Sequence, residues 1–244
     1  MKQLGAFFGI GVGPGPAGFI PVAALAALQN SAVIFAPRAR SATTSIARQC
    51  LAGLAIPEER FRDIEFTMDP DRSLLRKHYA ELAELIAIEL REGRNVAYLT
   101  IGDSLTYSTY SYTLDAVLDI LPNVTHQTFP GITSYAAAAA ALEWPLGEGK
   151  ERTLILPCPD EGDVLRQEIE SHDIVVLMKI GHRLPKVLAL LRDMAIIDHC
   201  ALASRIGLPG EVLQGNLHAL PSDVSLGYLS TMLIRKTPRE TRHS

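Results

Sequence analysis

The sequence has few cysteines, and they form no pairing pattern. Cys50, Cys158 and Cys200 are scattered, and none of them makes a C-x-x-C pair or stands at zinc-ligand spacing from a histidine. This argues against a disulfide framework and predicts no metal site. A chain with so few and such isolated thiols is typical of a reducing, cytoplasmic compartment.

The sequence also lacks a basic excess and an uninterrupted apolar run of membrane length. Its 23 Lys and Arg residues stand against 27 Asp and Glu, a formal net charge of -4, which predicts no nucleic-acid partner. Residues 3–37 carry no charge, but glycines and prolines interrupt them throughout. This segment therefore predicts two buried parallel strands joined by a helix, and no signal peptide or membrane span.

Strand-like and helix-like segments alternate along the rest of the chain. Apolar runs predict strands at residues 4–12, 32–37, 95–101, 124–129, 153–157, 173–180 and 199–206. Helical periodicity predicts helices at residues 19–30, 41–53, 73–91, 110–121, 133–144, 163–171 and 184–193. The alternation predicts an α/β protein with mainly parallel sheets.

Three local features complete this outline. Ser41 or Thr43 is expected near the cap of the helix at residues 41–53. The apolar segment at residues 224–236 is expected to form a closing antiparallel pair or one long strand. The Pro- and Gly-containing stretch "FPGIT" is interpreted as a hinge, which gives an N-terminal α/β domain at residues 1–128 and a C-terminal α/β domain at residues 129–244.

The first motif is the glycine-rich loop "GPGPAG" at residues 13–18, which fits the dinucleotide-binding pattern G-x-G-x-x-G. That pattern holds a pyrophosphate with main-chain N–H groups, and neither Pro14 nor Pro16 has one. Arg38 follows the second predicted strand, where it could bind a 2′-phosphate. An NADP-dependent oxidoreductase using the Gly13–Gly18 loop therefore stays open, as does a tight turn without a ligand.

The second motif is "GDSL" at residues 102–105, which matches the string that names a class of serine esterases. A nucleophilic Ser104 would need a histidine base oriented by a carboxylate. Each of the histidines lacks the aspartate three residues earlier that this hydrolase class carries. A GDSL-type esterase using Ser104 remains an alternative to a polar turn at the carboxyl end of a strand, where α/β sheets bind ligands.

Two further segments carry residues of interest. In "FPGITSYAAAAAAL", Thr133 and Ser134 can cap a helix whose alanines allow close packing of backbone or of a flat ligand. In "VVLMKIG", Met178 and Lys179 end a buried strand, where Lys179 would meet either an anionic substrate or solvent.

Taken in order, these segments resemble the tetrapyrrole (corrin/porphyrin) methyltransferase family over nearly the whole chain. Within it, "GDSLTYSTYSY" and "PLGEGKERTLILP" are most similar to the subgroup that methylates meso carbon 20 of precorrin-2 or cobalt-precorrin-2 in cobalamin biosynthesis. The family usually has an acidic residue where this chain has Pro16, and a proline where it has Ser104.

The resemblance implies two α/β domains of the class III methyltransferase type, with the methyl-donor site in the cleft between them. The domain at residues 1–128 would form the tetrapyrrole side and the domain at residues 129–244 the donor side. It also implies a homodimer, S-adenosyl-L-methionine as donor and S-adenosyl-L-homocysteine as product. Carried over position by position, the donor contacts are Pro14, Ile101, Gly102, Asp103, Thr106, Thr133, Ser134, Met178 and Ala203.

The implied reaction does not require a strong protein base before attack, because a meso carbon of a reduced tetrapyrrole is already nucleophilic. Asp103 is the nearest residue for electrostatic help in catalysis. A tetrapyrrole with many carboxylates predicts basic contacts, for which Arg38, Arg40 and Lys179 are expected. Tyr110, with Tyr107 and Tyr112 of the same motif, is expected to pack on the macrocycle. A non-catalytic tetrapyrrole carrier is the remaining alternative.

Overall fold

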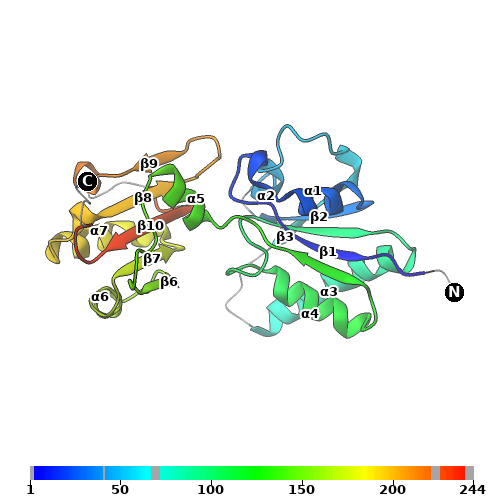
Figure 1. Ribbon diagram of the computed structural model, residues 1–244. Helices are drawn as coiled ribbons and strands as arrows, with labels where there is room; N and C mark the ends of the chain where they lie inside the picture. The colour runs from blue at the N-terminus through cyan, green and yellow to red at the C-terminus, as the bar shows by residue number, and fades with distance from the viewer. Residues whose placement is uncertain (1–2, 41, 67–71, 221–225, 240–244) are drawn as a thin grey trace. The chain divides into compact units, whose positions relative to one another are not determined.

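The structure, a computed structural model, describes residues 3–40, 42–66, 72–220 and 226–239 (Figure 1). The chain divides into two compact units, Met1–Thr133 and Ser134–Ser244, called unit 1 and unit 2 here. The sequence places the boundary after residue 128, and the structure places it after Thr133. The α/β class that the sequence predicts is confirmed in both units.

Unit 1 is built on a five-stranded sheet in which every neighbouring pair is parallel, in the order β3-β2-β4-β1-β5. Helices α1 and α2 lie on one side of this sheet and α3 and α4 on the other (Figure 1). Strand β4 is buried along its whole length and β1 at every residue except the half-buried Phe8, as expected for a sheet covered on both faces. The elements are β1 (Phe7–Gly11), α1 (Val22–Gln29), β2 (Val33–Ala39), α2 (Ile46–Gln49), β3 (Phe61–Phe66), α3 (Arg72–Arg91), β4 (Val96–Thr100), α4 (Tyr110–Ile120) and β5 (His126–Phe129).

Unit 2 holds a second five-stranded sheet, in the order β6-β7-β10-β8-β9. Its elements are α5 (Ser134–Ala141), β6 (Thr153–Pro157), α6 (Gly162–Ser171), β7 (Ile174–Met178), α7 (Leu184–Asp193), β8 (Cys200–Ser204), β9 (Val212–Gln214) and β10 (Ser230–Arg235). Only β6 and β7 pair in parallel; the other three pairs are antiparallel. The expectation of mainly parallel sheets is therefore correct for unit 1 and wrong for unit 2, because β10 inserts between β7 and β8 and runs against both.

The sheet of unit 2 separates two apolar clusters. On one face, α6 and α7 pack on Leu177, Met232 and Ile234. On the other face, α5 packs on Val176, Ala203 and Leu233. Residues of β10 alternate between these clusters, as the twofold repeat of a strand requires.

Some local expectations differ from the structure. Of the helix expected at residues 41–53, the structure has the single turn α2. Its cap is Ser45, whose hydroxyl accepts from Arg48 N at 3.4 Å, and not Thr43. Ser41 itself lies outside the described residues. Strands β3 and β9 are additional to those the sequence predicts.

The described cysteines are free and buried. Burial raises the pKa of Cys50 and of Cys200 to about 12, so both stay protonated thiols at neutral pH. Among the residues that the structure describes, no helix combines the length and the apolar character needed to cross a membrane.

Candidate functional site

Three neighbouring strands of unit 1, β4, β1 and β5, end side by side, and the backbone that follows them converges. Gly13 and Gly102 exchange two main-chain hydrogen bonds, of 3.1 Å from Gly13 N and 2.8 Å from Gly102 N. A Cβ on Gly131 would overlap the carbonyl oxygen of Gly102, and one on Gly11 would lie 2.6 Å from Gly131 N. Glycine is therefore required where the three connections meet.

Asp103 ties this turn together through its carboxylate. Its Oδ1 accepts from Leu105 N at 3.0 Å and from both N and Oγ1 of Thr106 at 2.9 Å, while Oδ2 accepts from Gly131 N at 3.1 Å. Partial burial alone would raise the pKa of Asp103, but these hydrogen bonds outweigh it and lower the pKa below its usual value. Asp103 is thus ionised at neutral pH and fully engaged.

The other expected donor contacts of unit 1 lie on or next to this turn. Ile101 and Gly102 precede Asp103, and the Ile101 side chain is 38 % exposed. Pro14 is buried and directly follows Gly13, whose backbone is bonded to Gly102. Thr133 stands at the end of the connection that carries Gly131. The structure thus gathers these positions around one backbone crossing.

The expected donor contacts of unit 2 gather around Thr231, a residue that the sequence analysis missed. The hydroxyls of Ser134 and Thr231 are 2.9 Å apart. Ala203 is the partner of Thr231 on β8, and Met232 pairs with Leu177 on β7, so Met178 flanks Thr231 on the opposite side. The alternation within residues 230–235 could have placed Thr231 on one face of a strand, but its neighbours depend on a strand order that the sequence does not state.

Small, buried side chains surround Thr231, which is itself 3 % exposed. Ala137 and Ala138 of α5 pack against Ala201 and Ala203 of β8 in one cluster. Trp144 and Leu146, from the connection after α5, and Met178 also pack on it. The alanine run therefore brings α5 close to the sheet, as the sequence suggested for backbone packing.

The basic residues expected to contact the substrate lie nearer to solvent than the residues around Thr231. Arg38 and Arg40, at the end of β2, both approach the Glu65 carboxylate, at 3.6 and 3.5 Å, and Arg40 is largely exposed. Lys179 follows Met178 with a positive φ of 53° and is exposed. Arg38 is partly buried and also donates to the carbonyl oxygen of Ala42 at 2.8 Å, whereas Arg40 and Lys179 are open to solvent.

Tyr110 lies in the core of unit 1. Its side chain is fully buried against Gly9, and its hydroxyl lies 2.9 Å from Thr128 Oγ1. A side chain with no exposed surface cannot pack on a macrocycle, so the structure removes Tyr110 from the substrate contacts. Tyr112, two residues later, is 60 % exposed.

The geometry does not support a serine nucleophile. Ser104 is fully buried, and its hydroxyl donates to the main-chain carbonyl of Phe129 at 2.8 Å. Thr100 Oγ1 lies on its other side at 3.5 Å. A hydroxyl held this way supports the turn and is closed to an ester substrate.

The glycine-rich loop likewise lacks the geometry of a pyrophosphate site. The N–H of Gly13 is already bonded to Gly102, and Pro14 and Pro16 have none to offer. The next α-helix, α1, starts only at Val22, after a short turn at Ala17–Phe19. The dinucleotide pattern needs a helix N-terminus directly at the turn, so the NADP alternative is not supported.

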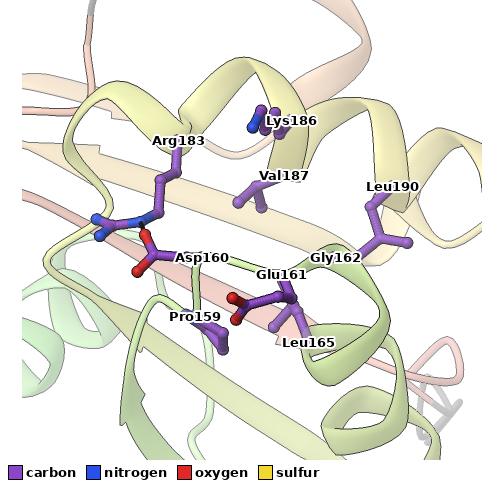
Figure 2. A pocket seen from close by; sticks show the side chains of 9 residues that line it. All are labelled: Pro159, Asp160, Glu161, Gly162, Leu165, Arg183, Lys186, Val187 and Leu190. Carbon is purple, nitrogen blue, oxygen red and sulfur yellow. Dashed lines mark hydrogen bonds and ion pairs between the residues drawn. The ribbon is translucent and has the colours of Figure 1, made fainter.

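A separate pocket of about 120 Å³ lies in unit 2 at the amino ends of α6 and α7 (Figure 2). Leu165, Val187 and Leu190 contribute apolar walls, and Arg183 Nε is paired with Asp160 Oδ1 at 2.6 Å across its mouth. None of the positions expected to contact donor or substrate lines this pocket.

Comparison with known proteins gives the class of the chain. The model of the tetrapyrrole (corrin/porphyrin) methylases matches residues 6–221, and the chain belongs to this family. It is therefore a methyltransferase.

Individual relatives narrow the comparison. The chain is 28 % identical over 237 residues to the cobalt-precorrin-2 C(20)-methyltransferase of Salmonella typhimurium, covering 95 % of this chain and 97 % of that protein. It is 31 % identical over 234 residues to a probable cobalt-precorrin-2 C(20)-methyltransferase of Methanocaldococcus jannaschii, covering 95 % and 96 %. The solved structure of a cobalt precorrin-4 methyltransferase shares the fold, with a TM-score of 0.68 at 19 % identity over 96 % of both chains.

Proposed function

We propose that this protein is an S-adenosylmethionine-dependent C-methyltransferase acting on carbon 20 of precorrin-2 or cobalt-precorrin-2 in cobalamin biosynthesis. The observation that carries the proposal is the match, over nearly the whole of both chains, to two relatives named for this reaction. Both names specify the cobalt complex, which favours that form as substrate.

The residues gathered in each unit fit a sulfonium donor better than a nucleotide. The turn of unit 1 contains one ionised carboxylate, that of Asp103. The main-chain N–H groups of Gly13 and Gly102 are already hydrogen-bonded to each other's carbonyl oxygens. A carboxylate there opposes a phosphate and favours a cation. The small and apolar side chains around Thr231 in unit 2 suit an adenine or a thioether chain.

Bound S-adenosylmethionine supplies an electrophilic methyl group on a sulfonium sulfur, for in-line transfer to a nucleophilic carbon. The protein's task is then to hold both reactants in line and to exclude water. We assign the turn at Gly102, Asp103 and Thr106 in unit 1, and Ser134, Met178 and Ala203 in unit 2, to holding the donor.

Asp103 acts in this proposal as a positioning and electrostatic group. Its oxygens accept four hydrogen bonds and its pKa is lowered, which makes it a poor proton acceptor. The proton that carbon 20 loses would therefore pass to water or to a weak base other than Asp103.

We further propose that unit 1 takes the tetrapyrrole. Two guanidinium groups, those of Arg38 and Arg40, lie at the carboxyl end of β2. Both pair with the Glu65 carboxylate and are therefore close to each other. Guanidinium groups bind carboxylates through paired hydrogen bonds, and the substrate's carboxylates can exchange with Glu65 for them. Lys179 in unit 2 would meet a further carboxylate.

The homodimer stays a prediction from the family resemblance, and the cytoplasmic location stays a prediction from the scattered cysteines. The free, buried thiols are compatible with a reducing compartment. Light scattering on the purified protein would give the oligomeric state directly.

The test of the proposal is methyl transfer in vitro. The protein is mixed with S-adenosylmethionine and either precorrin-2 or cobalt-precorrin-2, and the product is analysed by mass spectrometry. We expect a gain of one methyl group, faster with the cobalt complex. Absence of transfer to both substrates, with no donor binding by calorimetry, would sink the proposal.

A further inference from the structure

Arg235 is a buried cation at the end of the central strand of unit 2. Its side chain is only 5 % exposed. The guanidinium forms an ion pair with Glu151, donates to the carbonyl oxygen of Pro145 at 3.2 Å, and lies 5.2 Å from the ring centroid of Trp144. Its Nη2 also lies 3.9 Å from Glu148 Oε2. One side chain on β10 thus contacts four residues of the connection between α5 and β6.

That connection is also bonded within itself. Glu151 accepts from Glu148 N at 2.8 Å, and Trp144 N donates back to Ala139 of α5 at 2.8 Å. The segment at residues 144–151, called the tryptophan loop here, is therefore continuous with α5 at one end and bound to Arg235 at the other.

The tryptophan loop packs on the cluster that contains the expected donor contacts. Trp144 and Leu146 lie on the same group of side chains as Met178 and Ala203. Thr231, Leu233 and Arg235 occupy alternate positions of β10 and so share its face toward α5. The bond from Thr231 to Ser134 and the contacts of Arg235 thus fasten α5 and the tryptophan loop to one strand.

Stability alone does not account for an arginine at this position. Burying a guanidinium and a carboxylate costs a desolvation penalty that an apolar pair of similar size avoids. The ion pair of Arg235 with Glu151, together with the contacts to the Pro145 carbonyl and the Trp144 ring, instead holds the loop in one defined arrangement. A site built from small side chains needs that definition, because its shape comes from the elements that cover it.

We propose that Arg235 is a positioning residue for the methyl-donor site: it fixes the tryptophan loop, and through it α5, against the cluster that includes Met178, Ala203 and Thr231. The inference rests on the proposed function. It predicts that loss of Arg235 weakens donor binding and leaves the transfer step at saturating donor nearly intact.

Trp144 makes the inference measurable, because it is the one tryptophan of the chain. S-adenosylhomocysteine is titrated into wild type and Arg235→Met while tryptophan fluorescence is recorded. We expect the ligand to change Trp144 emission in wild type, and Arg235→Met to show altered emission without ligand and a Kd raised on the order of tenfold. In turnover, the KM for S-adenosylmethionine should rise similarly with kcat changed by less than about twofold.

Two variants separate positioning from general damage. Arg235→Lys keeps a charge for Glu151 but not the planar group for Pro145 and Trp144, so it should restore part of the affinity. Arg239→Met is the matched control: Arg239 binds Glu148 of the same loop at 2.7 Å but is about half exposed, and its loss should leave Kd and emission unchanged.

The outcomes are distinguishable. Wild type that binds S-adenosylhomocysteine, with a folded Arg235→Met of unchanged Kd, overturns this inference and leaves the proposed function standing. Wild type that binds no S-adenosylhomocysteine overturns both. If Arg235→Met does not fold, the double variant Glu148→Gln/Glu151→Gln decides, because it keeps Arg235 and removes both carboxylates that pair with it: a raised Kd supports the inference and an unchanged Kd overturns it.

Discussion

Asp103 and Gly131, which follow different strands of unit 1, are joined by a hydrogen bond of 3.1 Å from Gly131 N to Asp103 Oδ2. The same carboxylate closes its own turn through Leu105 and Thr106. One side chain therefore links the connection after β4 to the connection after β5. The expected donor contacts of unit 1 depend on that link.

Replacing Asp103 by asparagine should weaken both the fold and the site. The asparagine amide keeps one acceptor oxygen, but its NH₂ group replaces the other and faces N–H or O–H donors that bonded to the carboxylate. We expect the free energy of unfolding to fall by about 1–3 kcal/mol and the Kd for S-adenosylhomocysteine to rise. Urea titration and calorimetry measure the two effects. Asp115→Asn, at an exposed position of α4, should change neither.

The difference in unfolding free energy between wild type and Asp103→Asn should depend on pH, because the pKa of Asp103 is lowered in the folded protein. The unfolded carboxyl has a pKa of about 3.9, so the stabilisation by ionised Asp103 is complete above that value and is lost as pH falls through the lower folded pKa. The stability gap between wild type and Asp103→Asn should be constant near neutrality and shrink below about pH 4. A gap that widens in acid contradicts the assignment.

Gly131 should not tolerate a side chain. A Cβ there would overlap the carbonyl oxygen of Gly102, and neither backbone can yield without opening the Asp103 link. We expect Gly131→Ala to cost at least about 3 kcal/mol in unfolding free energy, or to prevent folding. Gly18→Ala, where a Cβ meets nothing within 4 Å, is the control and should melt like wild type.

Ser104→Ala should affect stability and not chemistry. The variant leaves the Phe129 carbonyl without its buried donor, which costs about 1–3 kcal/mol. Methyl transfer should persist, and neither protein should hydrolyse a p-nitrophenyl ester. Ester hydrolysis by wild type that disappears in Ser104→Ala would restore the esterase alternative.

Thr231→Val tests the convergence in unit 2. The substitution keeps the shape and removes the hydroxyl that faces Ser134. We expect the KM for S-adenosylmethionine to rise severalfold, because α5 loses a bond, worth about 0.5–1.5 kcal/mol, that holds Ser134 beside Met178 and Ala203. Thr113→Val removes a buried hydroxyl from α4, bonded to Thr109 O, and should lower stability without changing this KM.

Local patterns in the sequence predicted much of unit 1 and less of unit 2. Continuous apolar runs such as residues 95–101 identified buried parallel strands, because such strands are covered on both faces. The strand β3 was missed, since the adjacent charged residues Arg62 and Asp63 break the alternation of polar and apolar residues that indicates a strand. Strand β10 was recognised as extended, but its central antiparallel place depends on contacts far apart in the chain.

The site residues likewise fall into those that a local motif identifies and those that depend on contacts far apart in the chain. Gly102, Asp103 and Thr106 could be named because the short motif that contains them resembles a turn of the tetrapyrrole methyltransferases. Thr231 could not, because it acquires its neighbours Ala203 and Met178 only when β10 enters the sheet. Tyr110 was assigned to the substrate from its motif, while its burial is decided by Gly9 opposite it on β1.

The most direct test of the central claim is the position of the new methyl group. The protein is incubated with cobalt-precorrin-2 and S-adenosylmethionine labelled with ¹³C in the methyl group, and the product is examined by carbon NMR. The account predicts one labelled methyl, bonded to carbon 20. A label on another carbon or on an oxygen, or no label in the tetrapyrrole, would contradict it.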